Sequence, residues 1–559
     1  MVNRIIRAMS REISGLHEAA YILATFAVLS QILALFRDKL FALFFGAGDM
    51  LDVYYSAFRI PDLIFVSIGS IVSASILLPY LMSHFEKGKA DGNRFADQIF
   101  TVFFFLVIIV GIVVFILAPR LVEWLLPGFR YDPHLGDLIT MTRIMLLSPV
   151  LLGLSNLYSS LTQMNHRFLL YALSPILYNI SIILGIVLFY PIMGITGLAL
   201  GVVIGAFLHL FVQVPYMKKE GLVPSLTCRI EWKKIGNVFA NALPRMVTLS
   251  SSQLATFFLV SLASLMAVGS ISVFTLAFNL QSVPLTIIGA SYTSAVFPSL
   301  SRLIVQGKRS EFLEKIIASA QHIIFWSVPL MVLFVVLRAQ IVRVIYGAGA
   351  FDWNDTKLTA AVLALFVIST VAQSLILLFV RSYYAEGKTA QPLLISVISG
   401  GLIALFGYIF VKFFFTFPIF KFFVESLLRV GGQRGTSVLM LALAYSLGVI
   451  INMIVLWIFF ERKNKGFSKP VLSTLFHSLS ASIIMGYMSF LSLRVFANFF
   501  PLTKVWGVFL QGLFSGIIGI AVGIIILHLL GNKELKVVLN TLHTRIWKTN
   551  VPPPEVEHI

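Results

Sequence analysis

Charged residues are scarce in this sequence: only 12% of its 559 residues are Asp, Glu, Lys or Arg, whereas 58% are hydrophobic. An ordinary soluble domain contains about 25% charged residues. Because so few charges cannot cover the surface of a soluble protein of this size, the scarcity excludes a soluble globular chain. The mean hydropathy is +0.94, and apolar stretches recur along the whole length. Most of the chain is therefore expected to lie in a lipid bilayer.

Cysteine is almost absent as well. The chain has one cysteine, Cys228, which falls in a predicted cytoplasmic loop. A single cysteine excludes an intrachain disulfide and a cysteine metal cluster. The ten histidines are scattered along the chain. A membrane enzyme would need a cluster of acids or a metal site, and the sequence shows neither. The sequence also lacks a Gly-rich phosphate loop of the Walker type. It therefore predicts no enzyme, no metal site and no cofactor.

Acidic residues are the scarcer charges: 24 Asp and Glu stand against 42 Lys and Arg, a net charge of +18. In a soluble protein this balance would suggest nucleic acid, but the cytoplasmic loops of membrane proteins carry the same excess. Most basic residues fall in the connections that lie inside if the N-terminus is inside. Examples are Lys87, Lys89, Arg94, Arg302, Lys308, Arg309, Arg462, Lys463 and Lys465. We expect a multi-pass protein of the inner (cytoplasmic) membrane, with both termini cytoplasmic and no nucleic-acid partner.

Long apolar runs predict an all-α, polytopic membrane protein. A window of roughly 19 residues gives about fourteen transmembrane helices. Their approximate ranges are 20–45, 53–82, 97–118, 138–162, 168–190, 193–216, 238–266, 271–300, 318–338, 358–384, 391–416, 437–460, 473–495 and 505–530. The segment 417–436 is either an outer interfacial helix or an ordinary loop.

The chain also resembles itself. The first copy runs from Ser30-Gln31 through Gly48, Ala57-Phe58-Arg59 and Pro79 to Gly88-Lys89, and the second from Ser252-Gln253 through Gly269, Ala277-Phe278-Asn279 and Pro298 to Gly307-Lys308. The copies are six spans apart, an even number, so they have the same orientation. This is the plan of a two-lobed transporter with its substrate site between the lobes.

The repeat divides the chain into four parts. Residues 1–217 form an N-terminal six-helix lobe, and residues 218–237 form a cytoplasmic linker between the lobes. Residues 238–461 form the C-terminal six-helix lobe. Residues 462–559 comprise two additional transmembrane helices and a cytoplasmic tail.

Charges within the spans are candidate functional residues, because a charge in the bilayer is costly unless it is paired or hydrated. The first copy carries Arg37, Asp38, Asp52, Arg59 and Asp62. Arg37 and Asp38 point about 100° apart on a helix and need not pair. Arg37 either lines a cavity or extends to the outer interface with Asp52 as its partner. Arg59 and Asp62 share a helix face and either neutralise one another or serve function.

The second copy carries fewer charges. Asn279 occupies the position that corresponds to Arg59. Arg245, at the inner start of the seventh span, either lines the inner mouth of the cavity or follows the positive-inside rule. Arginines around a water-filled cavity would suit an anionic substrate, and the guanidinium fork suits phosphate oxygens. Electrostatics alone does not distinguish a diphosphate from a carboxylate.

Ordered motifs extend over nearly the whole chain. They are Ser30-Gln31-Ile32-Leu33-Ala34-Leu35-Phe36-Arg37-Asp38, Phe45-Gly46-Ala47-Gly48, Asp52, Ala57-Phe58-Arg59-Ile60-Pro61-Asp62-Leu63, Asn165-His166-Arg167-Phe168, Pro175, Asn179, Gln213-Val214-Pro215, Lys218-Lys219-Glu220-Gly221, Phe297-Pro298-Ser299-Leu300-Ser301, Tyr346-Gly347, Tyr383-Tyr384 and Pro392. In order and spacing the chain resembles the MurJ/MviN family, the lipid II flippases of bacterial cell-wall synthesis. This family lies within the multidrug/oligosaccharidyl-lipid/polysaccharide exporter superfamily.

The resemblance implies two six-helix lobes around a cationic cavity, and two C-terminal helices that form a lipid-facing groove. It implies that undecaprenyl-diphosphate-linked muropeptide crosses from the inner to the outer leaflet by alternating access. Matching positions suggest Arg37, Asp38, Asp52 and Arg59 as substrate-binding residues, to which we add Arg245 and Asn279.

The chain departs from the family at several basic positions. The family usually has arginines where this chain has Gln31 and Asn279, and in the stretch 65–70. Arg245 or Arg143 is a candidate to compensate for them. The alternatives are an exporter of another polyprenyl-diphosphate-linked glycan and a non-transporting scaffold of cell-wall assembly. Expected partners are the anionic lipid-linked glycan and membrane lipids; cell-wall synthesis proteins are further candidates, and a monomer is expected.

Overall fold

The described part of the chain consists of helices joined by turns and loops. The computed structural model describes residues 16–165 and 167–539, with only the backbone of residues 16–22, 24, 74, 75 and 245. Within these ranges there are helices and no β-strands, which confirms the all-α prediction. The first elements are α2 (Leu16–Phe45), α3 (Asp49–Ala57), α4 (Arg59–Ile64), η1 (Phe65–Gly69), α5 (Ala74–Phe85), α6 (Lys89–Leu125), η2 (Pro127–Phe129), α7 (Leu135–Met145), α8 (Leu147–Met164), α9 (Phe168–Leu184), η3 (Gly185–Phe189), α10 (Tyr190–Met193), α11 (Ile195–Phe211) and α12 (Val214–Glu220).

The remaining elements repeat much of this order. They are α13 (Trp232–Ser264), α14 (Ser270–Pro284), η4 (Leu285–Ala290), α15 (Ser291–Val305), α16 (Arg309–Val336), α17 (Arg338–Tyr346), α18 (Trp353–Val367), α19 (Thr370–Ala385), α20 (Ala390–Thr416), α21 (Pro418–Leu428), α22 (Val438–Lys463), α23 (Ser468–Phe496) and α24 (Val505–Leu529).

Twelve helical stretches of the described chain are long and apolar enough to cross a membrane. They are Lys89–Leu125, Leu135–Met164, Phe168–Met193, Ile195–Glu220, Met246–Ser264, Ser270–Val305, Arg309–Val336, Trp353–Ala385, Ala390–Thr416, Val438–Lys463, Ser468–Phe496 and Val505–Leu529. The first two predicted spans correspond to α2 and to the interrupted stretch α3–α5. The polytopic architecture is thus confirmed.

The second and eighth predicted spans are both interrupted by a π-helix. The π-helix η1 separates α4 from α5, and η4 separates α14 from α15 at the matching place in the repeat. Pro284 stands directly before η4, and a proline removes one backbone donor and crowds the preceding turn. Such a local change in the hydrogen-bond ladder is a recognised cause of helix bending. The repeat seen in the sequence therefore extends to an irregularity of the backbone.

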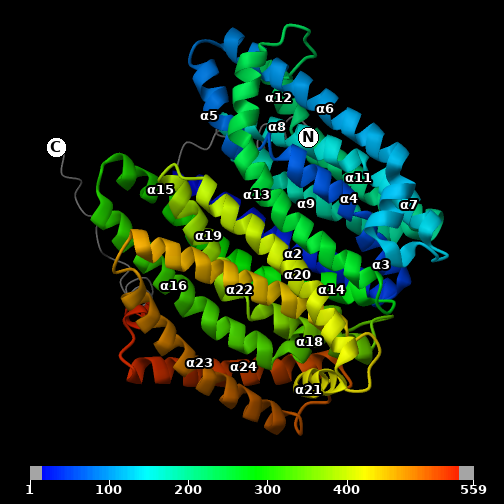
Figure 1. Ribbon diagram of the computed structural model, residues 1–559, viewed down its shortest axis with the longest axis vertical. Helices are drawn as coiled ribbons and strands as arrows, with labels where there is room; N and C mark the ends of the chain where they lie inside the picture. Colours follow the sequence, from blue (N-terminus) through cyan, green and yellow to red (C-terminus); the bar gives the residue numbers. More distant parts are fainter. Residues whose placement is uncertain (1–15, 166, 540–559) are drawn as a thin grey trace, which may run out of the picture. The chain divides into compact units, whose positions relative to one another are not determined.

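The chain forms two compact units, and most of the points at which it passes from one to the other fall within helices. One unit contains the described residues up to Leu280, with Ile345–Phe366 and Lys388–Asn452. In this unit α13 and α20 lie side by side, as do α2 and α9 (Figure 1). The division into lobes at residues 218–237, which follows the repeat, stays a prediction.

The other unit contains Gln281–Val344, Val367–Gly387 and the described residues from Met453 on. The C-terminal helices α23 and α24 pack against one another there, and α23 packs against α16 (Figure 1). Small residues allow close approach, which is typical of helix pairs in membranes. A Cβ on Gly519 of α24, for example, would run into the Ser489 hydroxyl of α23.

The predicted linker is held against the start of α6. The Lys89 ammonium donates to the Glu220 carbonyl oxygen (2.7 Å), and the backbone N–H of Ser225 donates to Asp97 Oδ1 (2.6 Å). Within the linker, a hydrogen bond from Lys234 lowers the pKa of the Glu231 carboxyl. Cys228 is exposed, and it is a free thiol.

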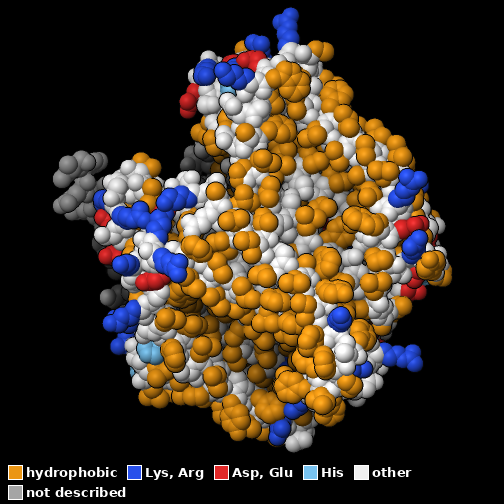
Figure 2. All heavy atoms as spheres, viewed as in Figure 1, with side chains coloured by type: hydrophobic (Ala, Val, Ile, Leu, Met, Phe, Trp, Pro, Cys, Tyr) orange, Lys and Arg blue, Asp and Glu red, His pale blue; other side chains and the backbone are white. Residues whose placement is uncertain are grey.

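Apolar side chains cover most of the face shown in Figure 2, with Lys and Arg gathered towards its margins. The segment that was either an interfacial helix or a loop contains the helix α21, which exposes Phe422, Phe423 and Leu427. An exposed apolar helix of this kind fits an interfacial position. The predicted cytoplasmic termini lie outside the described residues.

Candidate functional site

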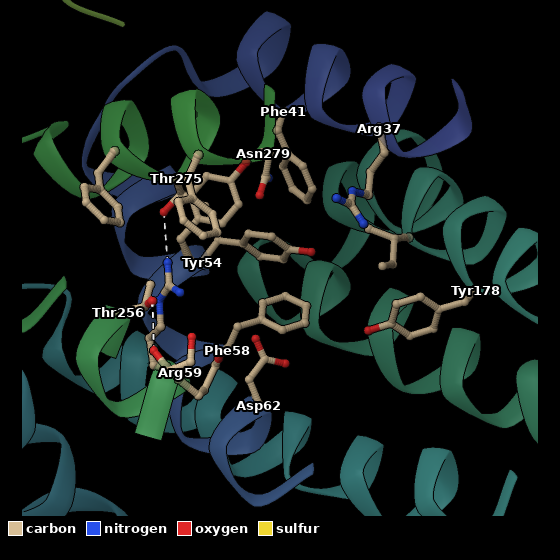
Figure 3. A pocket seen from close by; sticks show the side chains of 16 residues that line it. Arg37, Phe41, Tyr54, Phe58, Arg59, Asp62, Tyr178, Thr256, Thr275 and Asn279 are labelled. Atoms are coloured by element: carbon tan, nitrogen blue, oxygen red, sulfur yellow. Dashed lines mark hydrogen bonds between the residues drawn. The ribbon is translucent and has the colours of Figure 1, made fainter. Parts of the chain in front are cut away.

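A cavity of about 390 Å³ lies within the first compact unit, between α2, α3, α4 and α9 on one side and α13 and α14 on the other (Figure 3). Its lining combines arginines, phenols, amides and hydroxyls with phenylalanines. The lining residues are Arg37, Phe41, Tyr54, Tyr55, Phe58, Arg59, Asp62, Tyr178, Ile182, Ser252, Gln253, Thr256, Phe274, Thr275, Phe278 and Asn279. Both copies of the repeat therefore contribute to it.

Corresponding positions of the two copies line the cavity together. The first copy contributes Tyr54, Tyr55, Phe58 and Arg59, and the second contributes Phe274, Thr275, Phe278 and Asn279 at the matching positions. The rings of Phe58 and Phe278 are retained, whereas Arg59 is replaced by Asn279. The shape of the cavity is thus roughly two-fold, but its positive charge lies on the side of the first copy.

Arg37 is fully engaged by neighbouring side chains. Its Nε and Nη2 donate to Asp38 Oδ1 at 3.0 and 2.8 Å, and its Nη1 donates to Asn179 Oδ1 at 3.0 Å. The sequence left open whether these adjacent residues pair; they do, because the long arginine side chain folds back to its neighbour. The alternative prediction, that Asp52 is the partner of Arg37, was wrong, because Asp52 binds Gly269 and Ser272.

Asp38 links the two copies of the repeat. It is buried, and its Oδ2 accepts a hydrogen bond of 3.0 Å from the Asn279 amide. Arg37 and Asn279 both line the cavity, so Asp38 fixes two wall residues from behind. An uncompensated buried carboxylate would be costly, and these contacts compensate it.

Arg59 is less engaged. Its Nη2 donates to Thr275 Oγ1 at 2.9 Å, but its buried Nε has no hydrogen-bond partner in the described structure. Asp62 lines the same cavity and points into it (Figure 3). The described residues contain no ion pair between Arg59 and Asp62, so the proposed mutual neutralisation by direct contact is not observed.

Asp52 lies outside the cavity, at the N-terminal end of α14. Its carboxylate accepts the backbone N–H groups of Gly269 and Ser272, both at 2.7 Å, and the Ser272 hydroxyl at 2.5 Å. The first N–H groups of a helix lack partners within the helix, and a negative charge there is favourable. The carboxylate of Asp52 therefore caps α14.

The same end of this unit is closed by further backbone contacts. The N–H of Ala350 donates to the Leu43 carbonyl oxygen at 2.9 Å, and the N–H of Ala47 donates to Asp355 Oδ2 at 3.2 Å. A Cβ on Gly269, whose φ is +87°, would run into the Ala47 carbonyl oxygen. We call residues 43–48, 265–269 and 347–355, together with Asp52, the closed end.

Two other basic residues were candidates for the cavity. Arg143 is held elsewhere: its Nε donates to the Phe115 carbonyl oxygen at 3.2 Å, and its guanidinium lies 4.9 Å from the centre of the Phe115 ring. It does not line the cavity, so the idea that it compensates there was wrong. The side chain of Arg245, in α13, lies outside the part of the chain that the structure describes.

The cavity also contains residues that sequence reasoning missed. Tyr54, Tyr55 and Tyr178 bring phenol groups to it, and Thr256 brings a hydroxyl. Ser252 and Gln253 marked the start of the second copy, so the repeat itself carried a signal for them. The tyrosines gave no such signal, because aromatic residues are frequent throughout the spans.

The lining suits an anion with several oxygen atoms. Arginine and phenol groups can donate hydrogen bonds to phosphate oxygens, and Arg59 retains an unused donor for this purpose. The described residues contain no group of three or more His, Cys, Asp or Glu that could hold a metal ion.

Comparison with known families gives a match over most of the chain. A family model described as "Lipid II flippase MurJ" matches residues 41–419. The "Probable lipid II flippase MurJ" of Rhizobium tropici is 27% identical over 374 residues, which is 65% of this chain and 70% of that protein. The "Lipid II flippase MurJ" of Burkholderia cenocepacia is 26% identical over 407 residues, covering 71% and 78% of the two chains.

Solved structures share the fold. "Lipid II flippase MurJ, inward closed conformation" is similar with a TM-score of 0.71 and 22% identity, and the match covers 94% of this chain and 99% of that one. An inward-facing multidrug transporter of the MATE family matches with a TM-score of 0.61 and 12% identity, covering 80% and 99%. These likenesses show that the chain has a polytopic, all-helical fold similar to that of MurJ.

Proposed function

Because this chain belongs to the MurJ family of lipid II flippases, we propose that it moves lipid II from the inner to the outer leaflet of the bacterial cytoplasmic membrane. The observation that carries the proposal beyond family membership is the cavity shared by the two copies of the repeat, with Arg37 and Arg59 in its wall. In this proposal the protein transports its substrate and does not alter it chemically.

The two arginines of the cavity would have different roles in substrate binding. Arg37 is oriented by Asp38 and Asn179, so it acts as a fixed positive charge. Arg59 has a free Nε donor and is the residue we assign to direct contact with the diphosphate. Asn279 and Asp38 position these groups, and Asp52 acts at the closed end. Arg245 stays a candidate for the inner mouth.

Alternating access requires that one end close while the other opens. With the N-terminus inside, α2 rises outwards, so the closed end lies on the outer side and the cavity receives its substrate from the inside. The head group would enter the cavity while the polyprenyl tail stays in lipid. Opening would then separate residues 43–48 from residues 265–269.

A second candidate substrate is another polyprenyl-diphosphate-linked glycan. It is favoured by the small number of basic residues, since Gln31 and Asn279 occupy positions where the family usually has arginines. The diphosphate would be bound in the same way, and the sugar portion would differ. The same experiment distinguishes the two substrates.

Complementation tests the proposal directly. The full chain is expressed in a bacterium whose own lipid II flippase can be switched off, and growth and the sidedness of lipid II are followed. We expect rescue, and we expect the Arg59→Ala variant to abolish it. A correctly inserted protein that fails to move lipid II, but moves another lipid-linked glycan, would establish the second candidate; movement of neither would leave a scaffolding role.

A further inference from the structure

Asp62 is an acid in a cavity that should attract anions. It lies on α4, lines the cavity and points into it (Figure 3). Among the described residues, no hydrogen bond or ion pair is formed by its carboxylate. A carboxylate without a hydrogen bond or ion pair, in a wall that also carries Arg37 and Arg59, needs an explanation, because it would repel an anionic ligand.

The charges of the cavity fall into two opposite pairs. Arg37 and Asp38 form the first pair and are in direct contact. Arg59 and Asp62 form the second pair, but no contact joins them: Arg59 binds the neutral Thr275 hydroxyl instead. The net charge of the four groups is zero. These four charges therefore balance one another, while the free donor of Arg59 and the carboxylate of Asp62 both remain available.

Spacing places both members of the second pair next to the same ligand. Arg59 and Asp62 are three residues apart on one short helix, so they lie on the same face. A diphosphate bound to Arg59 would therefore lie close to the Asp62 carboxylate. Attraction and repulsion act on the same group, and the bound anion is held less tightly than by Arg59 alone.

Recognition of an amine on the head group would be another use for Asp62. The cavity, at about 390 Å³, is at the small end of ordinary ligand pockets, which hold about one drug-sized molecule. It holds only part of a sugar–peptide head group, and in this proposal the part that Arg59 binds is the diphosphate. Asp62 lies three residues from Arg59 on the same helix and therefore faces the same diphosphate. Repulsion of the diphosphate is the role that fits.

We propose that Asp62 limits the affinity of the cavity for the substrate's diphosphate and thereby speeds release. A transport site must bind strongly enough to load and weakly enough to unload, as is established for channel sites. On this view Asp62 is the internal counter-ion of Arg59 and balances it again once the substrate has left. The inference rests on the proposed function, since it concerns the same cavity.

Binding and turnover of an Asp62→Asn variant test this role. The purified full-length protein is titrated with farnesyl diphosphate, a short soluble polyprenyl diphosphate. Lipid II transport is then measured in vesicles as a function of lipid II concentration. Removing a nearby like charge should tighten binding of the probe by roughly tenfold. The KM for lipid II should fall, and the maximal rate should fall as well, because release becomes slower.

Two controls separate this effect from a general disturbance. Asp137→Asn removes an exposed carboxylate of α7 that does not line the cavity, and it should leave binding and rate unchanged. Asp62→Glu keeps the charge and should stay close to the original protein. If Asp62→Asn folds poorly, Asp62→Ser serves as the second neutral variant.

The outcomes distinguish the two levels of the proposal. An original protein that neither binds the probe nor moves lipid II refutes the proposed function. If that protein binds and transports, but the neutral variants bind the probe equally or more weakly, the counter-ion role of Asp62 is overturned. Tighter binding with slower turnover supports it.

Discussion

The sequence alone does not distinguish the roles of Arg37 and Arg59, but their guanidinium groups differ in how many hydrogen bonds they form to neighbouring side chains. Three donor atoms of Arg37 already bind Asp38 or Asn179. Arg59 uses one donor on Thr275 and has a buried Nε without a partner. A buried donor without an acceptor is destabilising until a ligand supplies one. The two arginines therefore have different roles in binding.

The Arg59→Lys variant should reveal this difference. A lysine keeps the charge but loses the planar fork, so it can no longer hold Thr275 and two phosphate oxygens at once. Loss of one hydrogen bond to a charged group costs about 1.5–3 kcal/mol. We expect the affinity for a polyprenyl diphosphate to fall at least tenfold, measured by titration of the purified protein. An Arg59→Lys variant with unchanged affinity would show that only charge matters.

The sequence predicted correctly that some of these residues share a cavity, but it did not predict the contacts of others. Arg37, Arg59 and Asn279 do share one cavity, and the repeat places Arg59 and Asn279 at corresponding positions. The pairing of Arg37 with Asp38 depends on a side-chain rotamer, which the pattern of residues does not encode. Asp52 contacts a helix more than two hundred positions away, and only the tertiary structure reveals that contact.

Among the structural elements, the closed end depends on a glycine. Gly269 has φ +87°, a conformation that glycine adopts readily and other residues adopt at a cost. Its missing Cβ also leaves room for the Ala47 carbonyl oxygen. The segment before α14 can therefore approach the segment before α3 closely, and this approach closes that end of the unit.

The Gly269→Ala variant should open the closed end. A thiol is introduced at Gln253 in the cavity, in a background with Cys228→Ser, and a membrane-impermeant thiol reagent is added outside intact cells. Backbone strain of about 1–3 kcal/mol and the steric conflict should raise labelling roughly tenfold. Gly307→Ala is the matched control, because Gly307 has φ +70° but open space where the Cβ would lie. Equal labelling in both variants would contradict the role of Gly269.

Close packing of the C-terminal helices gives a second prediction at this scale. Gly519→Ala would force a methyl group against the Ser489 hydroxyl, which is buried and has no hydrogen-bond partner in the described structure. We expect a loss of about 1–3 kcal/mol, seen as a lower midpoint of thermal unfolding in detergent. Adding Ser489→Ala should restore part of the loss. Gly111→Ala, with open space around the added Cβ, should show no loss.

Twelve of the roughly fourteen predicted spans match helical stretches of the described chain that are long and apolar enough to cross a membrane, because each span needs a long apolar run. The interruptions could not be predicted from hydropathy. The π-helices η1 and η4 lie inside apolar sequence, where a hydropathy window sees no change. The short helix α21 was one of two alternatives for its segment, since an apolar amphipathic stretch is compatible with both.

At the scale of the whole molecule, the orientation in the membrane stays a prediction that one native residue can test. Cys228 is exposed in the linker and is the sole cysteine of the chain. If the linker is cytoplasmic, an impermeant thiol reagent should label Cys228 only after the cells are permeabilised. Tyr131→Cys in a Cys228→Ser background, at an exposed site between α6 and α7, should be labelled in intact cells. The reverse pattern would invert the topology and place the closed end inside.

The contact between Asp52 and α14 has a consequence for the history of the chain. Asp52 and Ser272 occupy corresponding positions in the two copies of the repeat, and they touch one another. If both copies had carried aspartate there, two carboxylates would have met and repelled. The present cap could therefore form only after gene duplication had allowed these two positions to diverge. A symmetric pair of identical lobes could not have closed in this way.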